Sequence, residues 1–388
     1  MVLFGADRAA EYAHFFTGRV ALLTAPSGRT TDNRSTIEVL QGCCDLRLLL
    51  APEHGVRGDK AAGALFTDEI DTESGLPVRS LYTKESKRLS QETLAQFDTL
   101  VYDIADVGCR FYTFISTLRY CIEDCAAAGK RLVVLDRPNP LGDYVAGGLL
   151  REETTSFVGC YPLPVCYGLT CGELAGMMNA ELACGCDLKV VPCGGLTRNM
   201  TFRDWGHYWV MPSLGIPRYE TALLYAGTCL IEGTCLSEGR GTADPFAIIG
   251  APFVRAEELS RAFNALNCPG VVATPVYFTP TTSKHQGSLC GGIHLHIVDE
   301  AALHPVELGV RLVDLIRKLY PDDFKLLPPF REGGKPFISL LAGHRDFEDP
   351  EWDAEEILTR YERESAEFTA RKAPYEIYPK ENSYGNDH

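Results

Sequence analysis

The chain has 388 residues, of which 45% are hydrophobic and 23% are charged, and its formal net charge is −15. A chain longer than about 250–300 residues exceeds what one hydrophobic core usually supports, so two domains are expected. A strongly acidic chain without a basic cluster is poorly suited to binding nucleic acid or an anionic membrane, and neither is expected as a partner.

The 15 cysteines show no C-x-x-C pair and no regular spacing, which argues against a zinc site or a disulfide framework. We expect reduced thiols that pack as small hydrophobic side chains. The N-terminus lacks the basic and apolar regions of a signal peptide, and no apolar run approaches the about 18 residues of a membrane span. These observations predict a cytoplasmic protein.

In the first half of the chain, predicted strands alternate with predicted helices. The strands are 19–24, 46–51, 99–104, 131–135 and 188–192, and the helices are 35–41, 112–128 and 170–183. This alternation predicts an α/β fold with a Rossmann-like, doubly wound, mostly parallel sheet. No G-x-G-x-x-G follows the first strand, so a dinucleotide cofactor is not expected. The first domain is expected to span residues 1–195.

Charged residues follow three of these strands directly. Glu53, His54 and Arg57 come after strand 46–51. Asp103 lies near the end of strand 99–104, and Asp106 and Arg110 follow that strand. A cluster at 136–140 comes after strand 131–135. Ligands bind at the carboxyl edge of open α/β sheets. A carboxylate beside an imidazole, as at Glu53 and His54, is a plausible proton-transfer pair. The segment 59–80 is predicted to be a long loop that could form a wall over this site.

The second half, residues 196–388, is predicted to be a smaller auxiliary α/β domain. Helices are expected near 220–225 and at 256–266, 305–319 and 346–368, and strands at 271–278 and 293–298. The segment 232–244 is a polar, glycine-rich loop that carries Glu232, Glu238 and Arg240, and it could equally be a simple surface loop. His294 and His296 share one strand face, but without an obvious third ligand two half-buried histidines are favoured over a metal site.

Six motifs occur together along nearly the whole chain. They are EHGVRG at 53–58, DIADVGCRFYTF at 103–114, DRPNPLG at 136–142, YGLTCGELA at 167–175, EGTCLSEGRGT at 232–242 and TSKHQGSLCGG at 282–292. In this order they resemble the exo-β-N-acetylmuramidase family, formerly a domain of unknown function. The resemblance implies a Rossmann-like domain, an auxiliary domain and an active cleft between them. It also implies release of N-acetylmuramic acid from the non-reducing ends of peptidoglycan fragments, without a cofactor.

By this resemblance Glu53 matches the family's proposed catalytic glutamate, with His54 beside it. Glycoside hydrolysis generally uses a second carboxyl group as base or nucleophile. Glu232 ranks slightly above Glu238 for this role, and both rank above Asp103 and Asp106, which also count as substrate-binding candidates. Whether the cleft yields retention or inversion is left open.

The substrate of such an enzyme carries a lactyl ether with a carboxylate, which a guanidinium binds well. The candidate cations are Arg57, Arg110, Arg240 and Lys284, although each could instead form a structural ion pair. Candidates for the N-acetyl and hydroxyl groups are Tyr112, Thr113, Asn139 and His285, and Tyr167 or Trp209 could pack against the sugar ring.

Two other classes of function compete with this interpretation. One is a non-catalytic sugar- or muropeptide-binding protein with a hinged cleft. The other is a metal-dependent hydrolase that uses Asp103, Asp106 and the histidines. The favoured hypothesis expects no metal, a saccharide or muropeptide substrate, and a monomer or homodimer.

Overall fold

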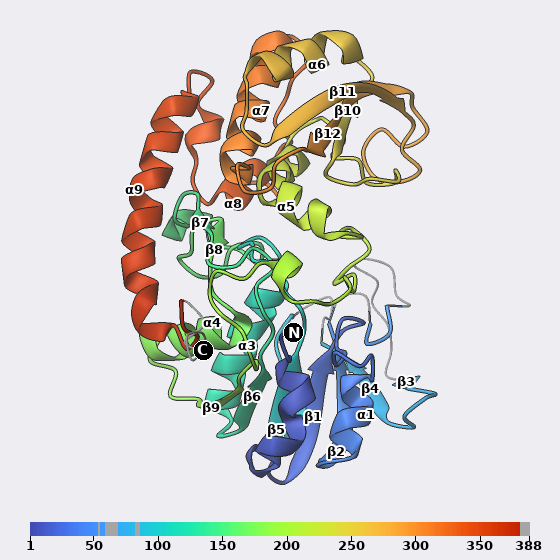
Figure 1. The fold of residues 1–388 in the computed structure, drawn as a ribbon, viewed down its shortest axis with the longest axis vertical. Helices are drawn as coiled ribbons and strands as arrows, with labels where there is room; N and C mark the ends of the chain where they lie inside the picture. The colour runs from blue at the N-terminus through green and yellow to red at the C-terminus, as the bar shows by residue number, and fades with distance from the viewer. Residues whose placement is uncertain (53–54, 59–68, 82–85, 381–388) are drawn as a thin grey trace, which may run out of the picture.

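A computed structural model of the chain describes residues 1–52, 55–58, 69–81 and 86–380 (Figure 1). Two lobes lie one above the other along the longest axis, each built around its own sheet. The alternation of helices and strands along the chain confirms the predicted α/β class.

The first lobe contains a seven-stranded sheet in the order β3-β4-β2-β1-β5-β6-β9. Its strands are β1 (Arg19–Thr24), β2 (Asp45–Ala51), β3 (Glu69–Ile70), β4 (Pro77–Ser80), β5 (Thr99–Asp103), β6 (Arg131–Leu135) and β9 (Asp187–Val191). All neighbouring strands are parallel except β3 and β4. The predicted Rossmann-like sheet is therefore confirmed.

Both faces of this sheet are covered, because alternate residues of its central strands enter different hydrophobic clusters. The covering helices are α1 (Thr36–Gln41), α2 (Gln91–Leu94), α3 (Phe114–Ala127) and α4 (Cys171–Glu181), with a 3-10 helix over Gly5–Phe15. In β1, Leu22 packs in the cluster that holds Leu40 of α1, whereas Leu23 packs in the cluster that holds Ile115 of α3. The sheet is buried on both sides, as parallel sheets generally are.

The second lobe contains a three-stranded antiparallel sheet in the order β10-β12-β11. Its elements are α5 (Tyr219–Thr228), β10 (Ile248–Ala251), α6 (Ala256–Ala265), β11 (Val271–Phe278), β12 (Cys290–Ile297) and α7 (Pro305–Leu319). Phe263 of α6, Leu295 of β12 and Val313 of α7 belong to one buried cluster. The helices thus cover a sheet with one apolar face.

The end of the chain returns from the second lobe to the first. After α8 (Phe337–Ala342), the long helix α9 (Ala354–Lys372) runs beside both lobes (Figure 1). It contacts β7 (Val145–Ala146), which pairs with β8 (Cys166–Tyr167) in a small two-stranded sheet. The Tyr378 hydroxyl then donates to Asp136 Oδ2 at 2.5 Å. One hydrophobic cluster includes residues of both lobes, and the boundary at residues 195 and 196 stays a prediction.

Several elements differ from the expectation. The described part of the expected loop 59–80 contains β3 and β4, whose two and four residues are too few to show a period. The helix-rich tail predicted at 346–368 contains a short 3-10 helix over Asp346–Glu348 and then α9, which begins at Ala354 because the Asp353 side chain accepts the N–H groups of residues 355 and 356. β12 begins three residues early, at Cys290, because its glycines allow close pairing with β10.

No helix in the described ranges combines the length and apolar character that a membrane crossing requires. The 15 cysteines are free, and most of them are buried.

Candidate functional site

Polar residues gather at the carboxyl edge of the first sheet, as expected from the strand ends. Asp103 ends β5 and is fully buried. Arg137, which follows β6, donates to it through Nε at 2.5 Å and Nη2 at 3.0 Å, and the Thr36 hydroxyl donates as well. Asp103 is therefore neutralised by a buried ion pair, which fixes the ends of β5 and β6 relative to each other.

Asp106, three residues further on, has a different environment. Its Oδ2 accepts the Gly108 backbone N–H at 2.7 Å and the Tyr167 hydroxyl, while its Oδ1 is buried without a hydrogen-bond partner among the described residues. Gly108 has a φ of +76°, and a side chain there would collide with Asn139. Burial raises the pKa of Asp106 to about 6, although the hydrogen bond from Tyr167 opposes this rise.

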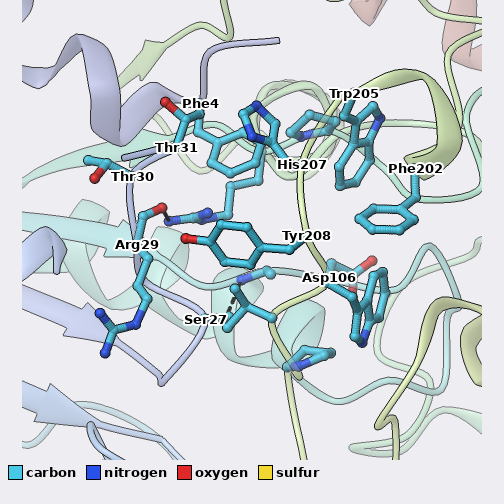
Figure 2. Close-up of a pocket in the computed structure, with 16 residues that line it drawn as sticks. Phe4, Ser27, Arg29, Thr30, Thr31, Asp106, Phe202, Trp205, His207 and Tyr208 are labelled. Carbon is cyan, nitrogen blue, oxygen red and sulfur yellow. Dashed lines mark hydrogen bonds between the residues drawn. The ribbon is translucent and has the colours of Figure 1, made fainter. Parts of the chain in front are cut away.

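Asp106 lines a cavity of about 50 Å³ that we call the aromatic cavity (Figure 2). Its residues are Phe4, Ser27, Arg29, Thr30, Thr31, Ala105, Asp106, Arg137, Pro138, Phe202, Trp205, His207, Tyr208, Trp209, Val210 and Pro212. Of the predicted site residues, it contains Asp106 and Trp209. The other lining residues of this cavity were not identified from the sequence, although the aromatic run at 202–209 could have indicated a ring-lined pocket.

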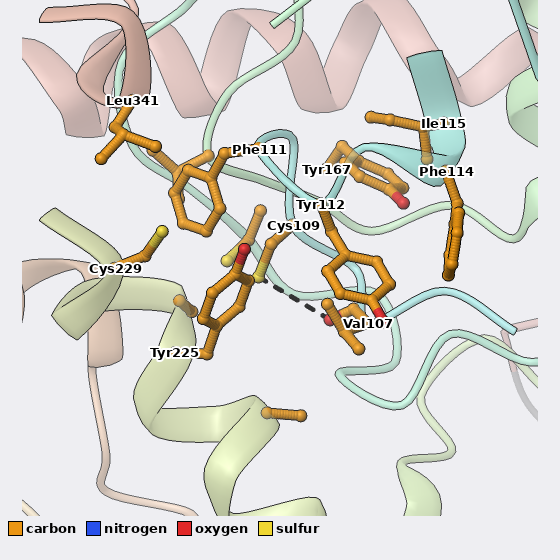
Figure 3. Packing of buried hydrophobic residues seen from close by; sticks show 14 of the residues in the cluster. Val107, Cys109, Phe111, Tyr112, Phe114, Ile115, Tyr167, Tyr225, Cys229 and Leu341 are labelled. Atoms are coloured by element: carbon orange, nitrogen blue, oxygen red, sulfur yellow. Dashed lines mark hydrogen bonds between the residues drawn. The ribbon is translucent and has the colours of Figure 1, made fainter. Parts of the chain in front are cut away.

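A second cavity, of about 350 Å³, lies next along the same chain segment, and we call it the Glu232 cavity. Its residues are Phe111, Tyr112, Thr113, Phe114, Val158, Ser213, Leu214, Gly215, Tyr225, Glu232, Arg240, Phe337 and Leu341. The Tyr225 ring meets the rings of Phe111 and Tyr112 edge-on, at centroid distances of 5.0 and 6.1 Å (Figure 3). Residues of two of the sequence motifs, 103–114 and 232–242, thus line one cavity together with Tyr225.

Glu232 is the acidic residue of this cavity. Its Oε1 accepts Arg240 Nε at 2.7 Å and Nη2 at 2.6 Å, and the Cys229 thiol approaches its Oε2 at 3.7 Å. Burial raises the pKa of Glu232, while the Arg240 guanidinium and Lys284 oppose the rise and the neighbouring Glu238 adds to it. Glu232 is therefore a carboxyl group with increased proton affinity, held by a fixed cation.

Glu238, the other acidic candidate from this loop, is 2% exposed and lies between two cations. Lys284 Nζ is 3.0 Å and Arg240 Nε is 3.4 Å from its carboxylate. Lys284 also donates to the Ile231 carbonyl at 2.8 Å, and a His285 ring nitrogen lies 2.7 Å from the Cys235 carbonyl. These contacts tie the loop 282–292 to the loop 232–242, so Lys284 has the structural role considered as its alternative.

The other predicted cations do not reach either cavity. Arg57 forms a bidentate ion pair with Asp71, at 2.9 and 2.8 Å. Arg110 is fully buried and donates to the backbone carbonyls of Gly148, Leu163 and Leu341 at 2.6–2.8 Å. Burial lowers the pKa of Arg110 to about 10. The expectation that Arg110 contacts substrate is corrected, because its guanidinium joins segments of the chain where no sugar can reach it.

Asn139 and Tyr167 are also used inside the protein. Asn139 donates to the Leu169 carbonyl at 3.1 Å and accepts the Leu141 N–H at 2.9 Å, which shapes the turn after β6. Tyr167 is fully buried, with its hydroxyl on Asp106. Its ring is not open to a sugar, so it acts on the site through Asp106.

Glu53 and His54 lie outside the described residues, so their catalytic roles stay predictions. The residues beside them are placed at the carboxyl end of β2, next to β1. Gly55 donates to the Pro52 carbonyl at 3.2 Å, and Gly58 lies against the ring of Pro26. Pro26 directly precedes Ser27 of the aromatic cavity.

The predicted histidine pair on β12 is present on one face, with ring centroids 4.3 Å apart. His294 contacts Asp244 at 2.9 Å, and His296 contacts Thr274 at 2.8 Å. Within the part of the chain that the structure describes, no three His, Cys, Asp or Glu side chains are grouped so that they could hold one metal ion.

Comparisons with known proteins agree over almost the full chain. Residues 20–220 match the family described as Exo-beta-N-acetylmuramidase NamZ, N-terminal, and residues 223–378 match its C-terminal counterpart. The sequence is 41% identical over 366 residues to Peptidoglycan beta-N-acetylmuramidase NamZ of Bacillus subtilis (strain 168), covering 93% of this chain and 87% of that protein.

Two crystal structures of DUF1343 family proteins from Bacteroides fragilis share the fold. One is 32% identical with a TM-score of 0.87, covering 97% of this chain and 99% of the other. The second is 29% identical with a TM-score of 0.77, covering 98% of this chain and 100% of the other.

Proposed function

Because the chain belongs to the exo-β-N-acetylmuramidase NamZ family, we propose that it hydrolyses the β-glycosidic bond of a terminal N-acetylmuramic acid at the non-reducing end of peptidoglycan fragments. The observation that carries the proposal is the Glu232 cavity, where a carboxyl group with a raised pKa lies beside a guanidinium and between aromatic walls. Aromatic rings and a few placed polar groups are typical of small-ligand sites.

Two carboxyl groups perform the reaction in this proposal. Glu53 gives its proton to the leaving oxygen as the bond to the anomeric carbon breaks. Glu232 acts as the second carboxyl group, either by taking a proton from the attacking water or by attacking the anomeric carbon to form a glycosyl-enzyme ester that water then hydrolyses. Its raised pKa supports this role, because a carboxylate with higher proton affinity is a better proton acceptor near neutral pH.

Arg240 is the residue we assign to the lactyl carboxylate. It lines the Glu232 cavity with its side chain 39% exposed, whereas Arg57 and Lys284 line neither cavity. A planar guanidinium can hold Glu232 on one edge and a second carboxylate on another. Tyr112 and Thr113 line the same cavity, and we assign them to the hydroxyl groups of the sugar.

The deciding experiment compares a chromogenic β-N-acetylmuramide with the matching β-N-acetylglucosaminide, which lacks only the lactyl group. We expect hydrolysis of the first and little of the second. Absence of hydrolysis, or equal hydrolysis of both, would contradict the proposal. Nuclear magnetic resonance of the first product would then distinguish retention from inversion.

Two controls address the competing functions. A Glu53→Gln variant of a binding protein would lose nothing, whereas a hydrolase should lose turnover and still bind N-acetylmuramic acid. Full activity after exhaustive chelation would eliminate a metal-dependent hydrolase.

A cytoplasmic location and a monomeric or homodimeric state also remain proposals. The 15 free cysteines support a reducing compartment, where thiols persist. Cell fractionation and size-exclusion chromatography would test the two proposals, and recovery of the protein in the culture medium would contradict the first.

A further inference from the structure

The aromatic cavity contains a hydrogen-bond acceptor that the described residues leave unused. Asp106 is 8% exposed, and both of its donors, the Gly108 N–H and the Tyr167 hydroxyl, bind Oδ2. Oδ1 has no partner in the described part of the chain. A buried unsatisfied acceptor costs about 1–3 kcal/mol, so a site that keeps one is suited to a ligand that supplies the missing donor.

The size of the cavity limits what that ligand can be. A volume of about 50 Å³ corresponds to about four water-sized positions, so it does not hold a whole sugar ring. It does hold a small substituent on a sugar. Most of the surrounding surface is apolar, and the lining includes the rings of Phe202, Trp205, Tyr208 and Trp209. The first three of these rings are labelled in Figure 2.

We propose that the aromatic cavity binds the 2-acetamido group of an N-acetylated substrate sugar, with the amide N–H donating to Asp106 Oδ1 and the methyl group packed against the aromatic rings. The Ser27 hydroxyl, which accepts the Ala105 N–H at 3.2 Å, can donate its own hydrogen to the amide carbonyl. An acetamido group therefore matches the cavity with a donor, an acceptor and an apolar end.

The neighbouring charges leave Asp106 available for this contact. Arg137 lines the same cavity but is held by Asp103 through two hydrogen bonds. Arg29, the other guanidinium at the cavity, donates to the Asn33 carbonyl at 3.0 Å. Since the pKa of Asp106 is about 6, its carboxylate is mostly ionised at pH 7 and accepts an N–H rather than donating a proton.

This inference rests on the proposed muramidase function, and its test keeps the two separate. Two substrate pairs are compared, each with and without one N-acetyl group. The first pair is a chromogenic N-acetylmuramide and its 2-amino form, and the second is the disaccharide of N-acetylmuramic acid and N-acetylglucosamine and its form with glucosamine. The ratio of kcat/KM between acetylated and deacetylated substrate is the readout.

In the Asp106→Asn variant we expect this ratio to fall at least tenfold in one pair. The asparagine oxygen stays with Gly108 and Tyr167, so its amide presents N–H groups where the substrate N–H needs an acceptor. The pair that responds shows whether the terminal or the second sugar enters the cavity. Glu364→Gln is the matched control, because Glu364 is also a buried carboxylate but lies on α9, where it accepts the Leu149 N–H.

If the folded Asp106→Asn protein keeps the wild-type ratio of kcat/KM between acetylated and deacetylated substrate in both pairs, the inference is overturned. The aromatic cavity would then hold water instead of an acetamido group. If that variant does not fold, Ser27→Ala decides, with a severalfold fall in the ratio expected and an unchanged ratio contradicting the inference. If the wild-type protein hydrolyses none of the four substrates, the proposed function fails instead.

Discussion

The aromatic cavity and the Glu232 cavity are lined by consecutive parts of the segment 208–215, but the acidic side chains of the two cavities have different partners. In the Glu232 cavity, Glu232 and Glu238 both contact Arg240, and Lys284 adds a second cation. In the aromatic cavity, Asp106 Oδ2 accepts a backbone N–H and a phenol hydroxyl and is paired with no cation among the described residues, because the nearby Arg137 is bound to Asp103. In the Glu232 cavity the carboxylates are paired with cations, whereas in the aromatic cavity Asp106 Oδ1 has no hydrogen-bond partner among the described residues.

This difference shows that an acidic side chain close to a basic one is not necessarily a residue that binds ligand. Asp103 and Asp106 are three residues apart at one strand end, yet one holds the scaffold together and the other faces a cavity. The useful distinction is which hydrogen-bonding positions remain after the protein has used its own. Four experiments test it, in order of decreasing effect.

The largest effect is expected from Glu232→Gln. Removing the second carboxyl group should lower kcat by about 100-fold or more, since positioned acid and base groups contribute about 10²–10⁴-fold. Steady-state kinetics on the chromogenic muramide provides the measurement. Glu364→Gln, which removes a buried carboxylate outside both cavities, should retain most activity, and a less than threefold loss in Glu232→Gln would remove this residue from the mechanism.

The second prediction concerns how the unfolding free energy depends on pH in the Asp106→Asn variant. Its folded pKa of about 6 exceeds an unfolded value of about 3.9. The protonated form therefore stabilises the fold fully below about pH 4, and this contribution of about 2–3 kcal/mol is lost as pH rises through about 6. Asp106→Asn should lose less unfolding free energy between pH 4 and pH 7 than the wild-type protein in urea titrations. Parallel losses in both proteins would contradict the environment described for Asp106.

A smaller effect should follow from Arg240→Gln. The Arg240 guanidinium opposes the rise in the pKa of Glu232, so its loss should raise that pKa further. The limb of the pH–rate profile that Glu232 controls should move upward by about one pH unit. Arg255→Gln, which removes an exposed arginine paired with Glu258, is the control and should leave the profile in place.

The smallest effect is expected from Arg57→Gln. Arg57 is a third exposed and pairs with Asp71, which also accepts hydrogen bonds from Ser74. Loss of one partly exposed ion pair should lower the unfolding free energy by about 1 kcal/mol and leave KM unchanged. Thermal unfolding and kinetics measure the two quantities, and a higher KM at unchanged stability would restore the predicted contact of Arg57 with substrate.

Much of the fold could be predicted because its signals are local. Short apolar runs such as Arg131–Leu135 and capped helices such as the one after Ser35 occur where expected. The elements that were missed depend on distant partners. β10 is only four residues long and exists by pairing with β12, about 40 residues later in the chain, which no local pattern reveals.

The motifs that contribute to the site could be predicted from the sequence, but the contacts that each side chain makes could not. The motif around Glu232 was identified, and its cavity forms against Tyr112 from the first lobe. In contrast, Arg110 follows a strand end just as Asp106 does, yet it points into the protein and binds three carbonyls. Residue type and position along the chain do not determine which side of a loop a side chain takes.

The contact of Tyr378 with Asp136 has a consequence for biosynthesis. Asp136 lies directly after β6 and is buried, where Thr170, Gly172 and Tyr378 donate to its carboxylate. During translation, β6 leaves the ribosome more than 200 residues before Tyr378 does. Tyr378 can therefore complete the set of donors around Asp136 only after α9 has been synthesised and has docked.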